Sequence, residues 1–447
     1  MRYLPNTPQN QRAMLDVIGV RGVEDLLVKI PAKARLSRPL ALPPALAESD
    51  LVRHLRELAG RDADADSHVC FLGAGAYDHY VPSPINHLVL RGEFLTAYTP
   101  YQPEASQGTL RTIYEYQTMI AELTGMDVAN ASIYDGGSSL AEATLMAHAV
   151  NGRTEIAMSA GVNPLYRHVV ETYVDGPGLR LREVAAPEGV TDLDAARRVV
   201  GARTAALVVQ APNFYGCLED VAAAGEVAHA AGALLIVVSD PVNLGVLEAP
   251  GRQGADVVVG EGQGLGVPLG FGGPYLGVFA AKQEFVRRLP GRLVGATVDA
   301  DGARGFALTL QTREQHIRRA KATSNICTNV ALCALMATIY LSTLGKQGLV
   351  RVGELSTAKA HYAARRLGEI PGVALRFAQP FFKEFALRLP KSPSSVVAKL
   401  AKKRILPGVP LKTYDRTLAD CLLVAVTEQR TREEIDAYAA ALAELVQ

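Results

Sequence analysis

The segment Asp256-Val-Val-Val-Gly-Glu-Gly-Gln-Gly-Leu-Gly-Val-Pro-Leu-Gly-Phe-Gly-Gly-Pro-Tyr-Leu-Gly277 joins two apolar runs through a glycine-rich loop. Val257–Val259 is β-branched, as in a buried strand, and the run Tyr275–Ala281 predicts the next strand. Glycine is favoured where a backbone turns at positive φ or approaches a ligand closely. Upstream, a third predicted strand ends just before Asp240. A carboxylate at the exit of a buried strand, followed by such a loop, is typical of a cofactor crevice in an α/β sheet.

Around this segment, from about residue 61 to 345, apolar runs alternate with helical periods, which predicts a doubly wound, mainly parallel α/β sheet. Residues 1–60 predict short helices in an N-terminal arm that cannot bury itself alone. A helix ending at Leu344 leads to a small α+β domain at 346–447. The strands predicted for the large domain are Val69–Leu72, Ala131–Tyr134, Glu155–Met158, Leu181–Val184, Ala205–Val209, Leu234–Val238, Val257–Val259, Leu276–Ala280 and Phe306–Leu310, and those for the small domain are Val373–Phe377, Phe385–Leu389 and Leu422–Val426.

The composition is that of an ordinary soluble protein, with 46 basic and 45 acidic side chains. This balance leaves no net field to attract nucleic acid or an anionic membrane. Five cysteines without a C-x-x-C pair favour reduced thiols and exclude a zinc-site pattern. No apolar run approaches the length of a membrane span. We therefore expect a cytoplasmic protein without a metal centre.

The turn Gly136-Gly137-Ser138 follows a predicted strand and opens a helix. Amides and a dipole at a helix start suit a phosphate group. An ordinary turn with Ser138 as helix N-cap is the alternative. Asp240 has two readings as well, as a cofactor ligand or as a turn aspartate before Pro241.

The segment from Tyr98 to Gly108 is rich in tyrosine, proline and amide side chains. Its prolines exclude regular helix or central strand, and Tyr98, Tyr101, Glu104 and Gln107 resemble a ligand-binding loop. A subunit contact is the alternative, because tyrosine suits interfaces equally well. We expect both: a loop that crosses an interface to reach a site. His79 and His168, outside this segment, are expected to be structural and helix-face residues, respectively.

The order of phosphate turn, aspartate and glycine-rich loop resembles the large domain of aminotransferase-like (fold type I) enzymes that use pyridoxal phosphate. In that family an aspartate pairs with the pyridine nitrogen, and a lysine two strands further on forms the Schiff base. The loop in this chain carries Gln263 and no lysine. An amide cannot form an imine, so we predict a cofactor pocket without its covalent anchor. Lys282 and Lys321 are the only lysines expected near the core, each as solvated charge.

Long blocks of the chain closely resemble subunit 1 (the α chain) of the two-chain glycine dehydrogenase (decarboxylating), the P-protein of the glycine cleavage system. The blocks are Phe94–Gly108, Tyr116–Glu122, Gly266–Pro274, Arg313–Asn329 and Pro380–Leu387. The resemblance covers the large domain and extends into the small one. It implies that only the homologous subunit 2 (β chain) keeps the lysine, and that Gln263 replaces it here.

The resemblance also implies what the assembly does. Glycine is decarboxylated and its aminomethyl group passes to the lipoamide of the H-protein, in an α2β2 tetramer with pyridoxal phosphate held by subunit 2. No residue of this chain alone is then catalytic. Tyr98, Tyr101, Glu104 and Gln107 would reach the partner's site, and Gly136, Gly137, Ser138, Asp240 and Gln263 would form a vestigial cofactor pocket. Two alternatives stay open: a self-sufficient enzyme using another lysine, and a scaffold without catalytic role.

Overall fold

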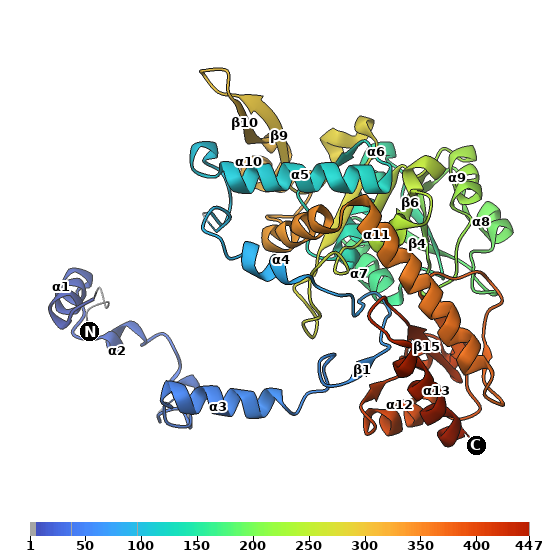
Figure 1. Cartoon of the computed structure of the whole chain (residues 1–447). Helices are drawn as coiled ribbons and strands as arrows, with labels where there is room; N and C mark the ends of the chain where they lie inside the picture. Colours follow the sequence, from blue (N-terminus) through green and yellow to red (C-terminus); the bar gives the residue numbers. More distant parts are fainter. Residues whose placement is uncertain (1–5, 37, 96, 447) are drawn as a thin grey trace. The chain divides into compact units, whose positions relative to one another are not determined.

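The structure, a computed structural model, describes residues 6–36, 38–95 and 97–446 in two compact units, Met1–Asp62 and Ala63–Gln447 (Figure 1). The first unit holds α1 (Pro8–Ile18), α2 (Val23–Leu26), a short 3-10 turn and α3 (Glu48–Ala59). Thr7 caps α1 through the Asn10 amide, and Gly19 ends it at a φ of 81°. No described residue of this unit is buried.

A seven-stranded sheet forms the centre of the second unit. Its order is β2-β8-β7-β6-β5-β3-β4, and the five strands from β7 to β4 are parallel. Strand β8 is antiparallel to both of its neighbours, β7 and β2. This confirms the predicted mainly parallel sheet. The strands are β2 (Val128–Ala129), β3 (Glu155–Ser159), β4 (Arg180–Val184), β5 (Thr204–Gln210), β6 (Leu234–Val238), β7 (Val257–Glu261) and β8 (Gly277–Ala281).

Helices cover both faces of this sheet, because successive side chains of a strand point to opposite sides. Leu235 and Val237 pack into one hydrophobic cluster, whereas Ile236 and Val238 pack into another. The first cluster includes side chains of α5 (Gln107–Thr124), α9 (Val221–Ala230) and the long α11 (Ala331–Gly368). The second includes α6 (Gly136–Asn151) and α7 (Pro164–Asp175). The result is a three-layer α/β arrangement (Figure 1).

A smaller antiparallel sheet, ordered β11-β12-β15-β14, follows α11. It is covered by α12 (Pro393–Ala401) and α13 (Arg432–Val446), which share a hydrophobic cluster with it and with the second half of α11. Gly345 interrupts α11 at φ 60°, ψ −176°, where the sequence predicted a helix end. The domain boundaries proposed at residues 60 and 345 stay predictions. The strands are β11 (Ala374–Leu375), β12 (Glu384–Arg388), β14 (Val409–Pro410) and β15 (Cys421–Ala425).

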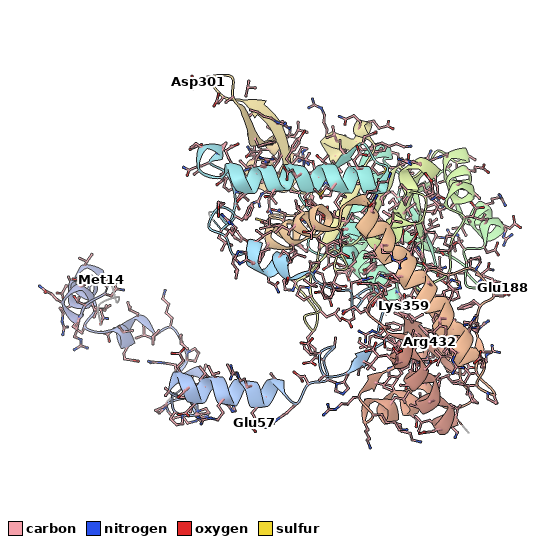
Figure 2. The ribbon with its side chains drawn as sticks, viewed as in Figure 1. Met14, Glu57, Glu188, Asp301, Lys359 and Arg432 are labelled. Atoms are coloured by element: carbon pink, nitrogen blue, oxygen red, sulfur yellow. The ribbon has the colours of Figure 1, made fainter. Side chains whose placement is uncertain are left out.

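Three strand predictions were wrong in their pairing or position. β1 (Val69–Cys70) pairs with β13 (Ile405–Leu406) and not with the large sheet. The segment predicted at 131–134 contributes only a bridge from Ile133, because the strand lies earlier, at β2. The predicted strand at 306–310 is β10 (Arg304–Thr309) of a separate hairpin with β9 (Leu293–Val298), which the sequence reading missed. Figure 2 shows Asp301 at the tip of this hairpin.

Within the described ranges, no helix is both long and apolar enough to cross a membrane. The same residues contain no group of three histidine, cysteine, aspartate or glutamate side chains placed to hold a metal ion.

Candidate functional site

The tyrosine-rich loop lies at the surface of the second unit. Tyr98 is 85% exposed and Tyr101 is 51% exposed. Glu104 is exposed on a single 3-10 turn, Pro103–Ala105, the only helix or strand between Ala97 and Ser106. The Tyr101 hydroxyl accepts from Arg292 Nη2 at 3.5 Å, whereas Tyr98 and Glu104 are exposed on this proline-restrained loop and are available to another molecule.

Gln107 differs from these three residues because its amide is used inside the chain. Its Nε2 donates to the Phe306 carbonyl and its Oε1 accepts from the Phe306 amide, both at 2.9 Å. Ten residues later on α5, Gln117 makes the same pair of bonds to Val294, at 3.0 and 2.9 Å. The two glutamines thus clamp both strands of the β9–β10 hairpin to α5. The geometry supports an architectural role for Gln107.

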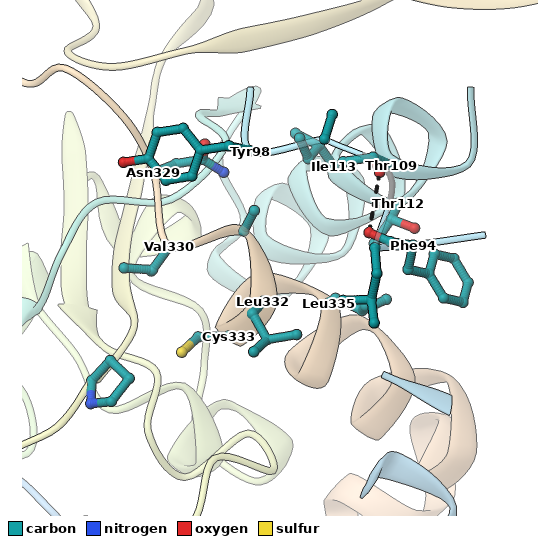
Figure 3. A pocket seen from close by; sticks show the side chains of 14 residues that line it. Phe94, Tyr98, Thr109, Thr112, Ile113, Asn329, Val330, Leu332, Cys333 and Leu335 are labelled. Atoms are coloured by element: carbon teal, nitrogen blue, oxygen red, sulfur yellow. Dashed lines mark hydrogen bonds between the residues drawn. The ribbon is translucent and has the colours of Figure 1, made fainter. Parts of the chain in front are cut away.

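A largely apolar cavity of about 460 Å³ lies beneath the tyrosine loop (Figure 3). Tyr98 and Asn329 both line it, and Val330 and Cys333 continue its wall along the start of α11. Pro274 brings the end of the glycine-rich loop to the same cavity. Its size suits a small ligand or an inserted aromatic side chain.

Behind Tyr101 lies Arg292, a buried cation that the sequence reading missed. Its side chain is 2% exposed, and its Cζ lies 5.6 Å from the centre of the Tyr101 ring. Nη1 donates to the Thr328 hydroxyl at 2.7 Å, and Nη2 donates to the Cys327 carbonyl at 2.8 Å. A desolvated guanidinium beneath a ring contributes a cation–π interaction. No motif signals it, because its partners come from a segment 35 residues away.

The predicted phosphate turn is occupied by the protein's own carboxyl group. Asp135 caps α6 by accepting from the Ser138 amide at 2.7 Å, so the reading of Ser138 as N-cap was wrong. The Gly136 amide donates to Glu261 Oε2 at 3.0 Å. Tyr166 covers the same turn: a β carbon at Gly136 would lie 2.7 Å from its hydroxyl oxygen. Glycine is required here for close packing.

Glu261 holds the glycine-rich loop together at the end of β7. Its Oε1 accepts from the amides of Gln263 and Leu276, at 3.0 and 2.8 Å. Burial raises the pKa of Glu261 to about 8, and the three amide donors act in the opposite direction. The carboxyl oxygens accept hydrogen bonds in either protonation state.

Asp240 caps a turn with one carboxylate oxygen and forms an ion pair with the other. Oδ1 accepts from the Val242 amide at 3.0 Å, which bears out its reading as a turn aspartate. Oδ2 lies 2.5 Å from Lys383 Nζ, an ion pair without hydrogen-bond alignment. Lys383 is therefore the lysine of this site, and the expectation that only Lys282 and Lys321 lie near the core was wrong. Lys321 is exposed, and Lys282 pairs with Asp256.

The Lys383 ammonium is 3% exposed and has two further neighbours. It lies 3.6 Å from the centre of the Tyr77 ring and 2.7 Å from His79 Nε2. His79 Nδ1 lies 2.6 Å from Glu428 Oε2. We assign His79 the tautomer with its proton on Nδ1, because Nε2 then accepts from the ammonium. Burial raises the pKa of Glu428, but the interactions with His79 and the hydrogen bond from the Tyr80 amide together outweigh burial and lower the pKa to about 2.

Gln263 is buried with both ends of its amide satisfied. Oε1 accepts from the Tyr77 amide at 2.9 Å, and Nε2 donates to the Val267 carbonyl at 2.8 Å. Its N–H also binds Glu261, so the turn, the loop and Tyr77 form one connected cluster. His79 belongs to this cluster as a structural residue, as expected, and His168 lies exposed on α7.

These residues do not fit pyridoxal phosphate. Position 263 offers no amine, Asp240 is already paired with a cation, and the first amide of α6 is taken by Glu261.

Comparisons with known proteins identify the family. The sequence model described as "Glycine cleavage system P-protein" matches residues 1–442. The chain is 51% identical over 442 residues to the probable glycine dehydrogenase (decarboxylating) subunit 1 of Desulforamulus reducens, covering 99% of each chain. A crystal structure of inhibitor-bound glycine decarboxylase (P-protein) superimposes with a TM-score of 0.90 at 48% identity over the full length of both chains.

More distant structures share the fold alone. A mutant of C-DES with glycine covalently linked to its PLP cofactor matches with a TM-score of 0.60 at 15% identity, covering 81% of this chain and 94% of the other. The fold is thus aminotransferase-like, as the sequence predicted. Together with the matches over nearly the whole length, this places the chain in the glycine cleavage system P-protein family.

Proposed function

We propose that this chain is subunit 1 of a two-subunit glycine decarboxylase whose pyridoxal phosphate is bound covalently by the homologous subunit 2. The observation that carries the proposal is Gln263, which stands in the loop where this fold keeps its reactive lysine. Its amide is buried and fixed by two backbone bonds, so it is built into the loop. The name "subunit 1" of the relatives supports a second chain.

The surface of the chain supports such a partner. Large apolar side chains remain exposed on the segment before the tyrosine loop, on that loop, on the glycine-rich loop and at the start of α11; they are Leu95, Tyr98, Tyr101, Leu269, Phe271 and Leu332. Large exposed apolar side chains that gather on a surface mark interaction sites. The N-terminal unit adds further exposed apolar residues, such as Val17 and Val28, and buries none. Both surfaces would be covered by subunit 2 in an α2β2 assembly.

The role of this chain is to complete the partner's site. Tyr98, Tyr101 and Glu104 would reach the glycine and cofactor, with Tyr101 supported from below by Arg292. Bound pyridoxal phosphate supplies the electron sink for loss of carbon dioxide. The loop would orient the substrate and exclude water from it. The aminomethyl group would then pass to the lipoyl arm of the H-protein. The net charge of the chain is close to zero, so it provides no electrostatic attraction for nucleic acid.

The test compares loop variants in the reconstituted complex. Tyr98→Phe with Tyr101→Phe should lower release of carbon dioxide from carboxyl-labelled glycine, while cofactor absorbance of subunit 2 stays normal. Tyr80→Phe, at another exposed tyrosine outside the loop, is the matched control. Unchanged turnover in the double variant would exclude these hydroxyls.

Two outcomes would favour the other readings. Full activity of subunit 2 alone would make this chain a scaffold. A borohydride-reducible adduct on this chain alone would make it self-sufficient. Lys383 is badly placed for that chemistry, because it pairs with the aspartate that faces the ring nitrogen in this fold.

A further inference from the structure

The cofactor pocket of this fold holds pyridoxal phosphate by two charged ends, its phosphate at a helix start and its ring nitrogen at an aspartate. In this chain each of the two anchors contacts a side chain of the protein itself. We propose that Glu261 and Lys383 substitute for the phosphate and the pyridinium nitrogen, respectively, so that the pocket is closed to the cofactor from within. The proposal rests on the proposed function only for identifying Asp240 and the α6 turn as these anchors.

At the start of α6, Glu261 provides the acceptor oxygens that a phosphate group would provide. Its carboxyl oxygens accept from the Gly136 amide at the start of α6 and from two amides of the glycine-rich loop. An oxygen acceptor at this place satisfies helix-start donors and interacts favourably with the helix dipole. Tyr166 closes the turn from another side. A phosphate group could enter only if Glu261 left.

At the other end, Lys383 supplies the positive charge of a pyridinium. Its ammonium pairs with Asp240, lies against the Tyr77 ring and donates to His79, so the buried cation has a charge partner and a hydrogen-bond acceptor. Lys383 precedes β12 of the small sheet, whereas Asp240 follows β6 of the large sheet. The ion pair therefore also joins the two sheets across the pocket.

An aromatic side chain lies at each of the two ends. The Tyr77 ring lies against Lys383, and its hydroxyl donates to Glu384 Oε2 at 2.9 Å. At the other end, a β carbon at Gly136 would lie 2.7 Å from the Tyr166 hydroxyl and 3.1 Å from Glu261 Cβ, and burial raises the pKa of Tyr166 well above its usual value. One aromatic ring of the chain thus lies next to each of the two anchors.

The experiment probes each end of the pocket separately in the full-length chain. Inorganic phosphate tests the helix end alone, and pyridoxine, which lacks a phosphate, tests the aspartate end alone. Wild-type chain should bind neither at millimolar concentration in a thermal-shift titration. Glu261→Ala should gain binding of phosphate but not of pyridoxine, and Lys383→Met should gain binding of pyridoxine but not of phosphate. Pyridoxal phosphate should bind each variant at least about tenfold more tightly than wild type, the effect of one recovered charged contact.

Lys282→Met is the control, because it removes a lysine–aspartate pair outside the pocket. Circular dichroism establishes that each variant is folded. If Glu261→Ala fails to fold, Lys383→Met with pyridoxine decides the question alone. The proposal is overturned if wild type binds pyridoxal phosphate as tightly as the variants, or if folded Lys383→Met gains no more binding than Lys282→Met. This experiment measures no glycine turnover. A failure of the proposed function would therefore be detected in the complex, independently of these binding results.

Discussion

Replacing Lys383 by methionine would leave Asp240 without its charge partner in a site where its side chain is only 19% exposed. Removing one member of a buried ion pair costs about 3 to 5 kcal/mol, because the other charge stays desolvated. Partial exposure of Asp240 and its bond from the Val242 amide place the expected loss at the lower end, about 3 kcal/mol. For a chain of 447 residues this corresponds to a fall of about 3 °C in melting temperature.

The assay is thermal unfolding of the full chain followed by circular dichroism, with Lys282→Met as reference. The Lys282 side chain is 36% exposed, and Asp256 keeps a second partner in His229, so that variant should lose about 1 kcal/mol or less. Adding Asp240→Asn to Lys383→Met should recover most of the loss, because no uncompensated charge then remains. Equal destabilisation by Lys383→Met and Lys282→Met would refute the reasoning.

Three further perturbations test other parts of the structure. Burial raises the pKa of Glu384 to about 7, so its contribution to stability is complete below pH 4.5 and is lost as the pH rises through 7. As the pH rises from 4.5 to 7, the free energy of unfolding of Glu384→Gln should therefore increase by about 3 kcal/mol relative to that of wild type, as measured by urea unfolding. A difference between the two proteins that does not depend on pH would contradict this. Gln107→Ala loses both hydrogen bonds to Phe306, so we expect the chain to be about 1 to 2 kcal/mol less stable and the β9–β10 hairpin to be cleaved faster by protease. An unchanged rate of cleavage would contradict the clamp. Gly136→Ala places a methyl group 2.7 Å from the Tyr166 hydroxyl and should cost about 1 to 3 kcal/mol in thermal unfolding, whereas a neutral result would show that the turn is loosely packed.

The central strands were predictable because their signal is local. Leu234–Val238 and the strand starting at Val257 are continuous apolar runs, and burial on both faces gives them that composition. The Val69–Cys70 strand was assigned to the wrong sheet, because its partner lies more than 330 residues away and a two-residue run carries no signal of pairing.

The site was predictable only in part for the same reason. The sequence indicated Asp240, the Gly136 turn and Gln263 through their place after strands. It did not indicate Lys383, whose neighbours Asp240 and His79 lie 143 and 304 residues away in the sequence. Glu261 was visible in the glycine-rich loop, but only the fold brings its carboxyl group to the Gly136 amide. Which surface residues cross to a partner subunit stays a prediction.

The central claim is that this chain serves a cofactor held by another chain. The most direct measurement begins with co-purification of this chain and subunit 2. The complex is loaded with pyridoxal phosphate and reduced with borohydride, and the mass of each chain is then measured by intact mass spectrometry. A pyridoxyl adduct on subunit 2 with this chain at its unmodified mass is the predicted result. An adduct on this chain would contradict the account.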